Sequence, residues 1–63
     1  MDKEEEKLFM QKAYLEGYYA FYDQIKYNDH YENPYKHDMH NYKMWQAWKS
    51  GWIQAEEDNN SPK

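Results

Sequence analysis

The chain has very few aliphatic side chains from which to build a hydrophobic core. Leu and Ile together occur four times and Val is absent, whereas Tyr, Trp and Phe supply thirteen rings among 63 residues. Each ring buries roughly 150–250 Å², so a few rings replace many aliphatic groups. A core in a chain this short rarely supplies more than about 3–5 kcal/mol, and there is no cysteine to add a disulfide. Any core must therefore be aromatic.

Two stretches show helical periodicity, and helix-breaking residues separate them. A first helix is expected over about residues 3–27, a connector over about 28–35, and a second helix over about 36–57. Asn33 is the expected N-cap of the second helix, with Pro34 in the first helical position, and Asp38 is the rival N-cap. Residues 1–57 then form one helical domain, and residues 58–63 are expected to be a disordered tail. The predicted fold class is all-α, a two-helix antiparallel hairpin with a short Pro-containing connector.

Gly51 stands inside the second expected helix, where glycine costs about 1 kcal/mol relative to alanine. A helical wheel places it on the inward face, and Gly17 holds the same place in the first helix. We expect each glycine to make room for rings of the other helix. Tolerance of Gly51 near a weak helix end is the alternative. The expected inward faces comprise Met10, Ala13, Tyr14, Gly17, Phe21 and Ile25, and Asn41, Met44, Trp48, Gly51, Trp52 and Ala55.

Three sequence blocks together resemble the ribosome modulation factor family of short bacterial proteins. The blocks are Ala13-x-x-x-Gly17-Tyr18-x-Ala20, then Pro34-Tyr35, then Trp48-x-x-Gly51-Trp52-x-x-Ala55. The resemblance implies two helices with a connector, and docking on ribosomal RNA during hibernation as the function. The family is rich in arginine and strongly basic, whereas this chain has no arginine and a net charge of −4. The resemblance therefore supports a shared scaffold more than a shared binding target.

The charge balance disfavours direct binding to nucleic acid. Proteins that hold phosphate backbones usually present basic patches and arginines, and the acids of this chain gather near its two ends. If ribosome binding is retained, aromatic rings would stack on unpaired bases. The RNA contacts would then come from Lys26, Lys36, Lys43 and Lys49. A further interpretation is an acidic mimic of nucleic acid that blocks a host nucleic-acid-binding protein.

A second apolar stripe on the first helix lies opposite its inward face. It consists of Leu8, Leu15, Tyr19 and Tyr22. A two-helix protein offers this stripe no internal partner, and exposed apolar patches often mark interaction sites. We expect it to bind a protein partner or to form a homodimer seam. Coverage by the connector or the tail is the alternative.

Catalytic and metal-binding patterns are weak. His37 and His40 have i, i+3 spacing and His30 lies nearby, but a solvated helix start explains them as well as a zinc site does. No nucleophile–base pair stands out, so we expect neither an enzyme nor a cofactor, metal or small-molecule substrate. No membrane span is expected.

The expected function is a cytoplasmic, non-catalytic protein that docks on a larger protein machine and modulates or inhibits it. Many Lys, Asn and Tyr residues without arginine would suit a virus, such as a phage, or a mobile element.

Overall fold

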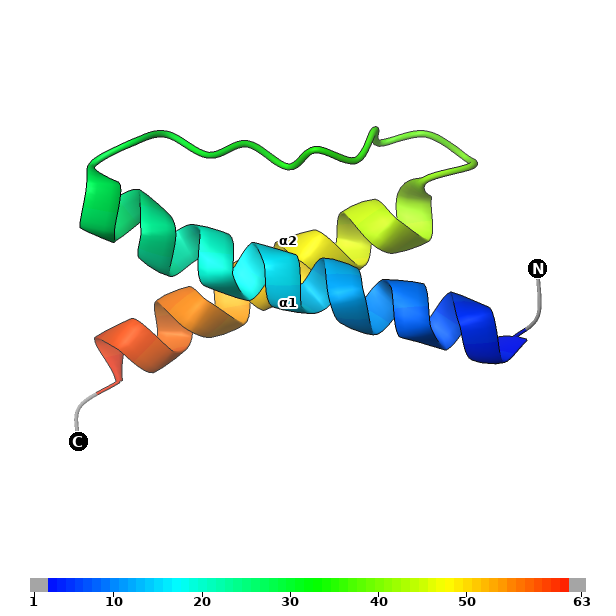
Figure 1. Cartoon of the computed structure of the whole chain (residues 1–63), viewed down its shortest axis with the longest axis horizontal. Helices are drawn as coiled ribbons and strands as arrows, with labels where there is room; N and C mark the ends of the chain where they lie inside the picture. The colour runs from blue at the N-terminus through cyan, green and yellow to red at the C-terminus, as the bar shows by residue number, and fades with distance from the viewer. Residues whose placement is uncertain (1–2, 62–63) are drawn as a thin grey trace.

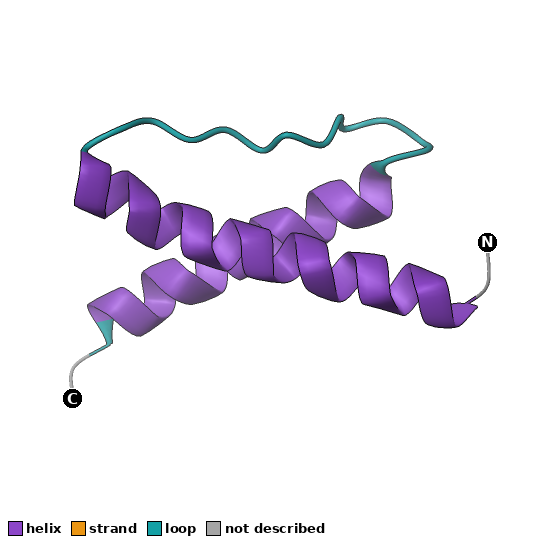
Figure 2. Ribbon diagram, in the orientation of Figure 1, coloured by secondary structure: helices purple, strands orange, loops and turns teal. Residues whose placement is uncertain are grey.

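Two packed helices and one long connector make up the protein (Figures 1 and 2). The computed structural model describes residues 3–61. Helix α1 runs over Lys3–Tyr27 and helix α2 over Tyr42–Asn60. Across residues 3–61 no strand is present, so the predicted all-α, two-helix fold is confirmed. The bounds of the first helix agree with the prediction.

The two helices run in the same direction, and the connector carries the chain back along their length (Figure 1). Near the start of α1, Glu6 pairs with Lys43 in the first turn of α2. Near the end of α1, the Tyr22 hydroxyl donates to the carbonyl of Ala55, 3.4 Å away, near the end of α2. These contacts correct the predicted antiparallel direction.

The length of the connector explains this difference. Antiparallel packing follows naturally from the connector of about eight residues that the sequence predicts. The connector spans residues 28–41 instead. A stretch of that length can reach roughly 45 Å when extended, which exceeds the roughly 28 Å length of a helix such as α2. The chain therefore has enough reach to begin α2 at the end where α1 began.

Gly17 and Gly51 are buried where the helices cross. A Cβ atom at Gly17 would lie 2.0 Å from the Trp48 carbonyl oxygen, and one at Gly51 would lie 1.9 Å from the Tyr14 carbonyl oxygen. Side chains do not approach backbone that closely. The predicted close packing is confirmed, but each glycine admits the backbone of the other helix rather than an aromatic ring.

The core is small and partly aromatic. Its buried apolar side chains are those of Ala13, Phe21, Ala47, Trp48 and Ala55. Trp52 stacks on Trp48 at a centroid distance of 5.4 Å, and the Phe21 ring meets Trp52 edge-on at 5.4 Å. Among the described residues, no large side chain is fully buried, so the fold depends on close backbone contact as much as on buried area.

The inward faces differ from the wheel at two positions. Ile25 is exposed rather than inward, because the two helices diverge from their crossing toward the end of α1 (Figure 1). Ala47 is buried, although the wheel did not place it on the inward face. It lies four residues before Gly51 and continues the series of small residues that ends at Ala55. A four-residue spacing keeps these positions on one side of a helix.

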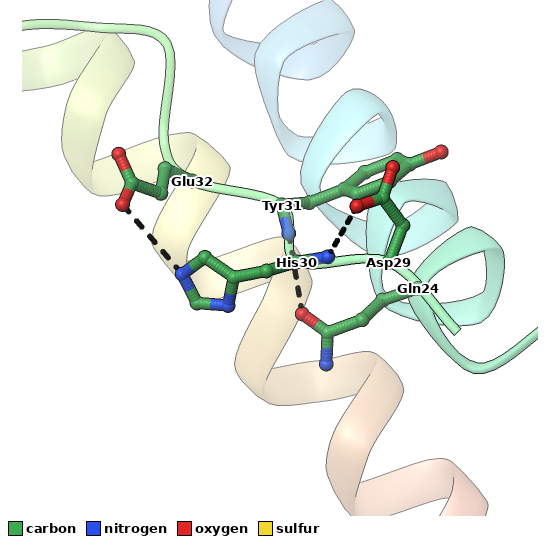
Figure 3. Close-up of polar contacts among 5 residues, drawn as sticks. All are labelled: Gln24, Asp29, His30, Tyr31 and Glu32. Carbon is green, nitrogen blue, oxygen red and sulfur yellow. Dashed lines mark hydrogen bonds and ion pairs between the residues drawn. The ribbon is translucent and has the colours of Figure 1, made fainter. Parts of the chain in front are cut away.

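Helix α1 ends in a turn that its own sequence specifies (Figure 3). Asn28 adopts a positive φ of 52°, and the amide of Asp29 donates to the carbonyl of Gln24 over 3.2 Å. This pattern is a Schellman cap. The Gln24 side chain then accepts from the amide of Tyr31 at 3.4 Å, and Asp29 Oδ1 accepts from the amide of His30 at 2.8 Å. The chain therefore leaves α1 in a defined direction.

Asn33 fixes the connector rather than capping a helix. Its Nδ2 donates to the carbonyl of Trp45 at 2.9 Å, and its Oδ1 accepts from the amide of Tyr35 at 3.0 Å. The Tyr35 ring packs against the core, and its hydroxyl donates to Glu16 Oε2 at 3.0 Å. The middle of the connector is thus tied to both helices.

Helix α2 begins at Tyr42 rather than at about residue 36, and Asn41 occupies the N-cap position. The predicted starts at Asn33 and Asp38 are therefore wrong. Asp38 Oδ1 instead accepts from the amides of His40 and Asn41, at 3.0 and 2.9 Å. A side chain that binds nearby amides competes with helix formation, and the His, Asp and Asn residues of this segment have low helix propensity.

Helix α2 also extends further than predicted. Residues 58–60 are helical, whereas the sequence assigned them to a disordered tail; residues 62–63 lie outside the described part of the chain. Asp58 holds this last turn, because its carboxylate accepts from the Tyr18 hydroxyl at 2.8 Å and from Gln54 Nε2 at 2.9 Å. A contact with α1 thus stabilises a helix end that composition alone would let fray.

Candidate functional site

Three large apolar side chains lie exposed in a row along α1, on the side away from α2. The exposed fractions are 64% for Leu8, 49% for Leu15 and 61% for Tyr19. We call these three residues the outer face of α1. They line a shallow hollow of about 620 Å³, and Tyr31 of the connector forms its far wall. Three of the four predicted partner-binding residues therefore share one accessible surface.

Tyr22, the fourth predicted partner-binding residue, lies apart from this surface. It is half-buried, and its hydroxyl reaches the Ala55 carbonyl across the helix pair. Its ring meets Phe21 edge-on at 5.5 Å and lies 5.4 Å from the Tyr18 ring. Tyr22 therefore takes part in the packing of α1 against α2.

A second hollow borders the outer face. It is a groove of about 550 Å³ between α1 and the first half of α2. Its apolar lining comes from Met10, Tyr14, Leu15 and Ala47. Leu15 borders both hollows, so it forms a ridge between them. Sequence reasoning missed this groove, because its outline depends on how the two helices cross. The available signal was the four-residue spacing of Ala47 from Gly51, which places Ala47 on the side of α2 that faces α1.

The four lysines predicted for RNA binding do not form one patch. Lys43 pairs with Glu6 near the start of α1, whereas Lys26 lies in the last turn of α1. Twenty residues of helix separate Glu6 from Lys26, or about 30 Å. Lys36 lies exposed in the connector, and Lys49 Nζ lies 4.9 Å from the centroid of the Trp45 ring.

A stack of rings stands at the start of α2. His37 stacks on Trp45 with centroids 4.2 Å apart, and Tyr42 lies parallel to Trp45 at 6.1 Å. Lys49 adds a cation–π contact to the same indole. This cluster places aromatic surface and one positive charge side by side, a combination that the sequence pattern did not predict.

The three histidines do not converge on a metal site. His30 Nε2 lies 3.6 Å from Glu32 Oε1 (Figure 3), His37 stacks on Trp45, and the His40 amide is bound by Asp38. Across residues 3–61, no three side chains of the metal-ligating types lie close enough to share an ion.

Local charges and hydrogen bonds shift the titration of several groups. Lys43, by hydrogen bond and by charge, lowers the pKa of Glu6. The hydrogen bond to Asp58 raises the pKa of Tyr18 well above its usual range. Burial, followed by the charges of Asp23 and Asp29, raises the pKa of Tyr31. These shifts belong to contacts that hold the fold, and none isolates an acid–base pair suited to proton transfer.

Neither helix within residues 3–61 has the length and apolar content needed to cross a bilayer. In the same part of the chain, every buried side-chain nitrogen and oxygen has a hydrogen-bond partner.

No family model, curated protein or solved structure matches the chain.

Proposed function

We propose that the protein is a small, non-catalytic, cytoplasmic binding protein that docks on a larger protein machine through the outer face of α1 and modulates or blocks it. The observation that carries this proposal is the row formed by Leu8, Leu15 and Tyr19, each about half or more exposed. Contiguous exposed apolar side chains are costly unless a partner covers them. Tyrosine is enriched among the residues that dominate interface energetics.

A scaffold like that of the ribosome modulation factor family is part of this proposal. The residues that carry the resemblance are largely those that pack the helices together: Ala13, Gly17, Trp48, Gly51 and Ala55 are buried. Tyr35 and Trp52 pack against the core. A resemblance concentrated in packing residues supports a shared scaffold and leaves the partner open. The lack of arginine favours a protein partner over ribosomal RNA.

Ribosome binding is the second candidate function, and the ring stack at the start of α2 favours it. His37, Trp45 and Lys49 combine stacking surface with a positive charge, and this combination suits unpaired bases. The wide separation of Lys26 from Lys43 argues against a continuous path for a phosphate backbone.

Nucleic-acid mimicry receives less support than protein docking. The acids of the first turn of α1 and those near the end of α2 lie at opposite ends of the molecule (Figure 1). A mimic presents a row of negative charges spaced like phosphates.

The test is affinity capture from host lysate at about 0.1 M and about 0.5 M salt, with wild type beside two matched variants. Leu15→Glu places a charge on the outer face. Met39→Glu makes a comparable change on the connector, where Met39 is 91% exposed.

We expect one protein to be retained by wild type and Met39→Glu at both salt concentrations and to be lost with Leu15→Glu. Equal capture by Leu15→Glu would refute docking through the outer face. Ribosomal RNA that is released at high salt and lost with Lys49→Ala would favour ribosome binding instead.

A further inference from the structure

The protein exposes more surface than a compact chain of its mass. Its accessible surface is 5312 Å². A compact monomer of 7.9 kDa exposes about 4,400 Å². The difference of about 900 Å² is close to the roughly 800 Å² that each partner buries in an interface of standard size. The excess surface is therefore of the size that one interface of standard area would remove, although the exposed connector also contributes to it.

Opposite charges near the two ends of α1 are placed symmetrically about Leu15. Glu4 lies eleven residues before Leu15 and Lys26 lies eleven after. If two copies of α1 pack antiparallel about a two-fold axis at Leu15, each acidic first turn meets Lys26 of the other copy. A parallel pair would bring like charges together instead.

The shape of the surface has the same self-complementarity. Leu15 is a ridge between the hollow beside Tyr19 and the groove beside Ala47. In a two-fold interface the same patch faces itself, so the two Leu15 side chains can lie side by side at the axis, each beside a hollow of the other copy. Helices pack by placing ridges of one into grooves of the other.

From the area, the charge symmetry and the shape, we propose that a second copy of this chain covers the outer face of α1, with the two α1 helices antiparallel about Leu15. This inference rests on the proposed function in one respect: if the outer face is the docking face, the homodimer occludes it. Self-association and partner docking are then mutually exclusive, and the concentration of free chain regulates docking.

The first experiment measures molar mass by sedimentation equilibrium of the purified full chain from about 5 µM to about 500 µM. We expect a rise from the 7.9 kDa chain mass to twice that value. Leu15→Glu places two like charges at the two-fold axis and should raise the dimer dissociation constant at least about thirty-fold.

Ile53→Glu is the matched control, because Ile53 is 45% exposed on α2, and it should leave association unchanged. Circular dichroism shows whether each variant keeps its helices. A mass of 7.9 kDa throughout, an assembly larger than two chains, or a dimer indifferent to Leu15→Glu would overturn the proposal.

A charge exchange tests the antiparallel arrangement. Glu4→Lys and Lys26→Glu should each raise the dimer dissociation constant about five-fold at low salt, because each turns an attraction into a repulsion at both ends of the interface. The double variant restores opposite charges and should return to within about two-fold of wild type. Additive weakening in the double variant would refute this register.

A cysteine at the axis tests occlusion. The natural chain has no cysteine, so Leu15→Cys introduces a single thiol, and facing residues of an antiparallel helix pair come within the roughly 7 Å that a disulfide needs between Cα atoms. Oxidation should link Leu15→Cys into dimers, whereas the control Ile53→Cys should stay unlinked. The linked dimer should capture no partner, and reduction should restore capture.

The two proposals fail in different ways. A chain that stays monomeric yet loses its partner on Leu15→Glu refutes the dimer alone. A dimer that Leu15→Glu dissociates, while the variant still captures the partner, refutes the docking face alone.

Discussion

Replacing Gly51 with alanine tests whether the two backbones touch. The added Cβ would lie 1.9 Å from the Tyr14 carbonyl oxygen, 2.8 Å from the Tyr14 carbonyl carbon and 3.0 Å from the Tyr18 amide nitrogen. An ordinary contact needs about 3.5 Å, so the helices must separate by about 1.5 Å at their crossing. Backbone cannot rotate aside as a flexible side chain can.

The energetic balance follows from two opposing effects. In an isolated helix, alanine is favoured over glycine by about 1 kcal/mol. Against this, overpacking typically costs about 1–3 kcal/mol. A gap of 1 Å also forfeits up to about half of the dispersion attraction across an interface. Because the whole core supplies only about 3–5 kcal/mol, we expect a net loss of about 2 kcal/mol. In a domain of this size, Tm should fall by about 8–16 °C.

The measurement is thermal unfolding by circular dichroism, at one protein concentration for all variants because self-association raises Tm. Ser50→Ala is the matched control: Ser50 is exposed beside Gly51, and alanine there should leave Tm unchanged or raise it slightly. Gly17→Ala should resemble Gly51→Ala, since its Cβ would meet the Trp48 carbonyl. The double variant should lose less than the sum, because both residues separate the same helices. A Tm for Gly51→Ala at or above wild type would refute backbone contact.

Three other predictions concern single contacts. Lys43→Ala should bring the pKa of Glu6, which Lys43 lowers, back toward its ordinary value in a carboxyl NMR titration. Because the pKa of Glu6 is lower in the folded state than in the unfolded state, the stability that the Glu6–Lys43 pair contributes is present above about pH 4.3 and is lost as pH falls. An identical Glu6 titration in the variant and in wild type would contradict the ion pair. Tyr18 has a raised pKa from its hydrogen bond to Asp58, so the stability it contributes is complete below about pH 10 and is lost as pH rises further. Tyr18→Phe should therefore show a smaller decline of Tm at alkaline pH than wild type, and equal declines would contradict it. Tyr22→Ala should lower stability by about 1–2 kcal/mol in urea unfolding, since it removes ring contacts and the bond to Ala55. Tyr19→Ala should leave the stability of the monomer unchanged at a protein concentration too low for self-association. The reverse order would show that the two tyrosines had been assigned the wrong roles.

Helix type and inward faces could be predicted because they depend on local periodicity. The spacing of Ala13, Gly17 and Phe21 placed these residues inward, and all three are buried. The outer face of α1 followed from the same wheel, since Leu8, Leu15 and Tyr19 lie opposite that stripe and are exposed. Local pattern could not predict the groove beside Leu15, because its walls belong to two helices.

The start of α2 was missed because a tertiary contact overrides a local signal. Asn33-Pro34 has the residue types of a helix start, yet the Asn33 side chain binds the Trp45 carbonyl twelve residues away. Tyr22 was misplaced for a related reason. Its position on the wheel lies near the outer face, but a tyrosine is long enough to reach back to Ala55.

Helix periodicity does not indicate the direction of α2, but the charge pattern of the sequence does. Acids lie in the first turn of α1, at Glu4, Glu5 and Glu6, and near the end of α2, at Glu56, Glu57 and Asp58. An antiparallel pair would bring these groups together, and they would repel. The observed direction separates them.

The same direction places Glu6 of α1 beside the amino end of α2, which has no acid in its own first turn. Acids near a helix amino end are stabilising, and Glu6 also pairs with Lys43 there. Glu6 thus stabilises the amino ends of both helices. A connector long enough to return along the helices is what this arrangement requires, so the charge pattern and the connector length favour the same topology.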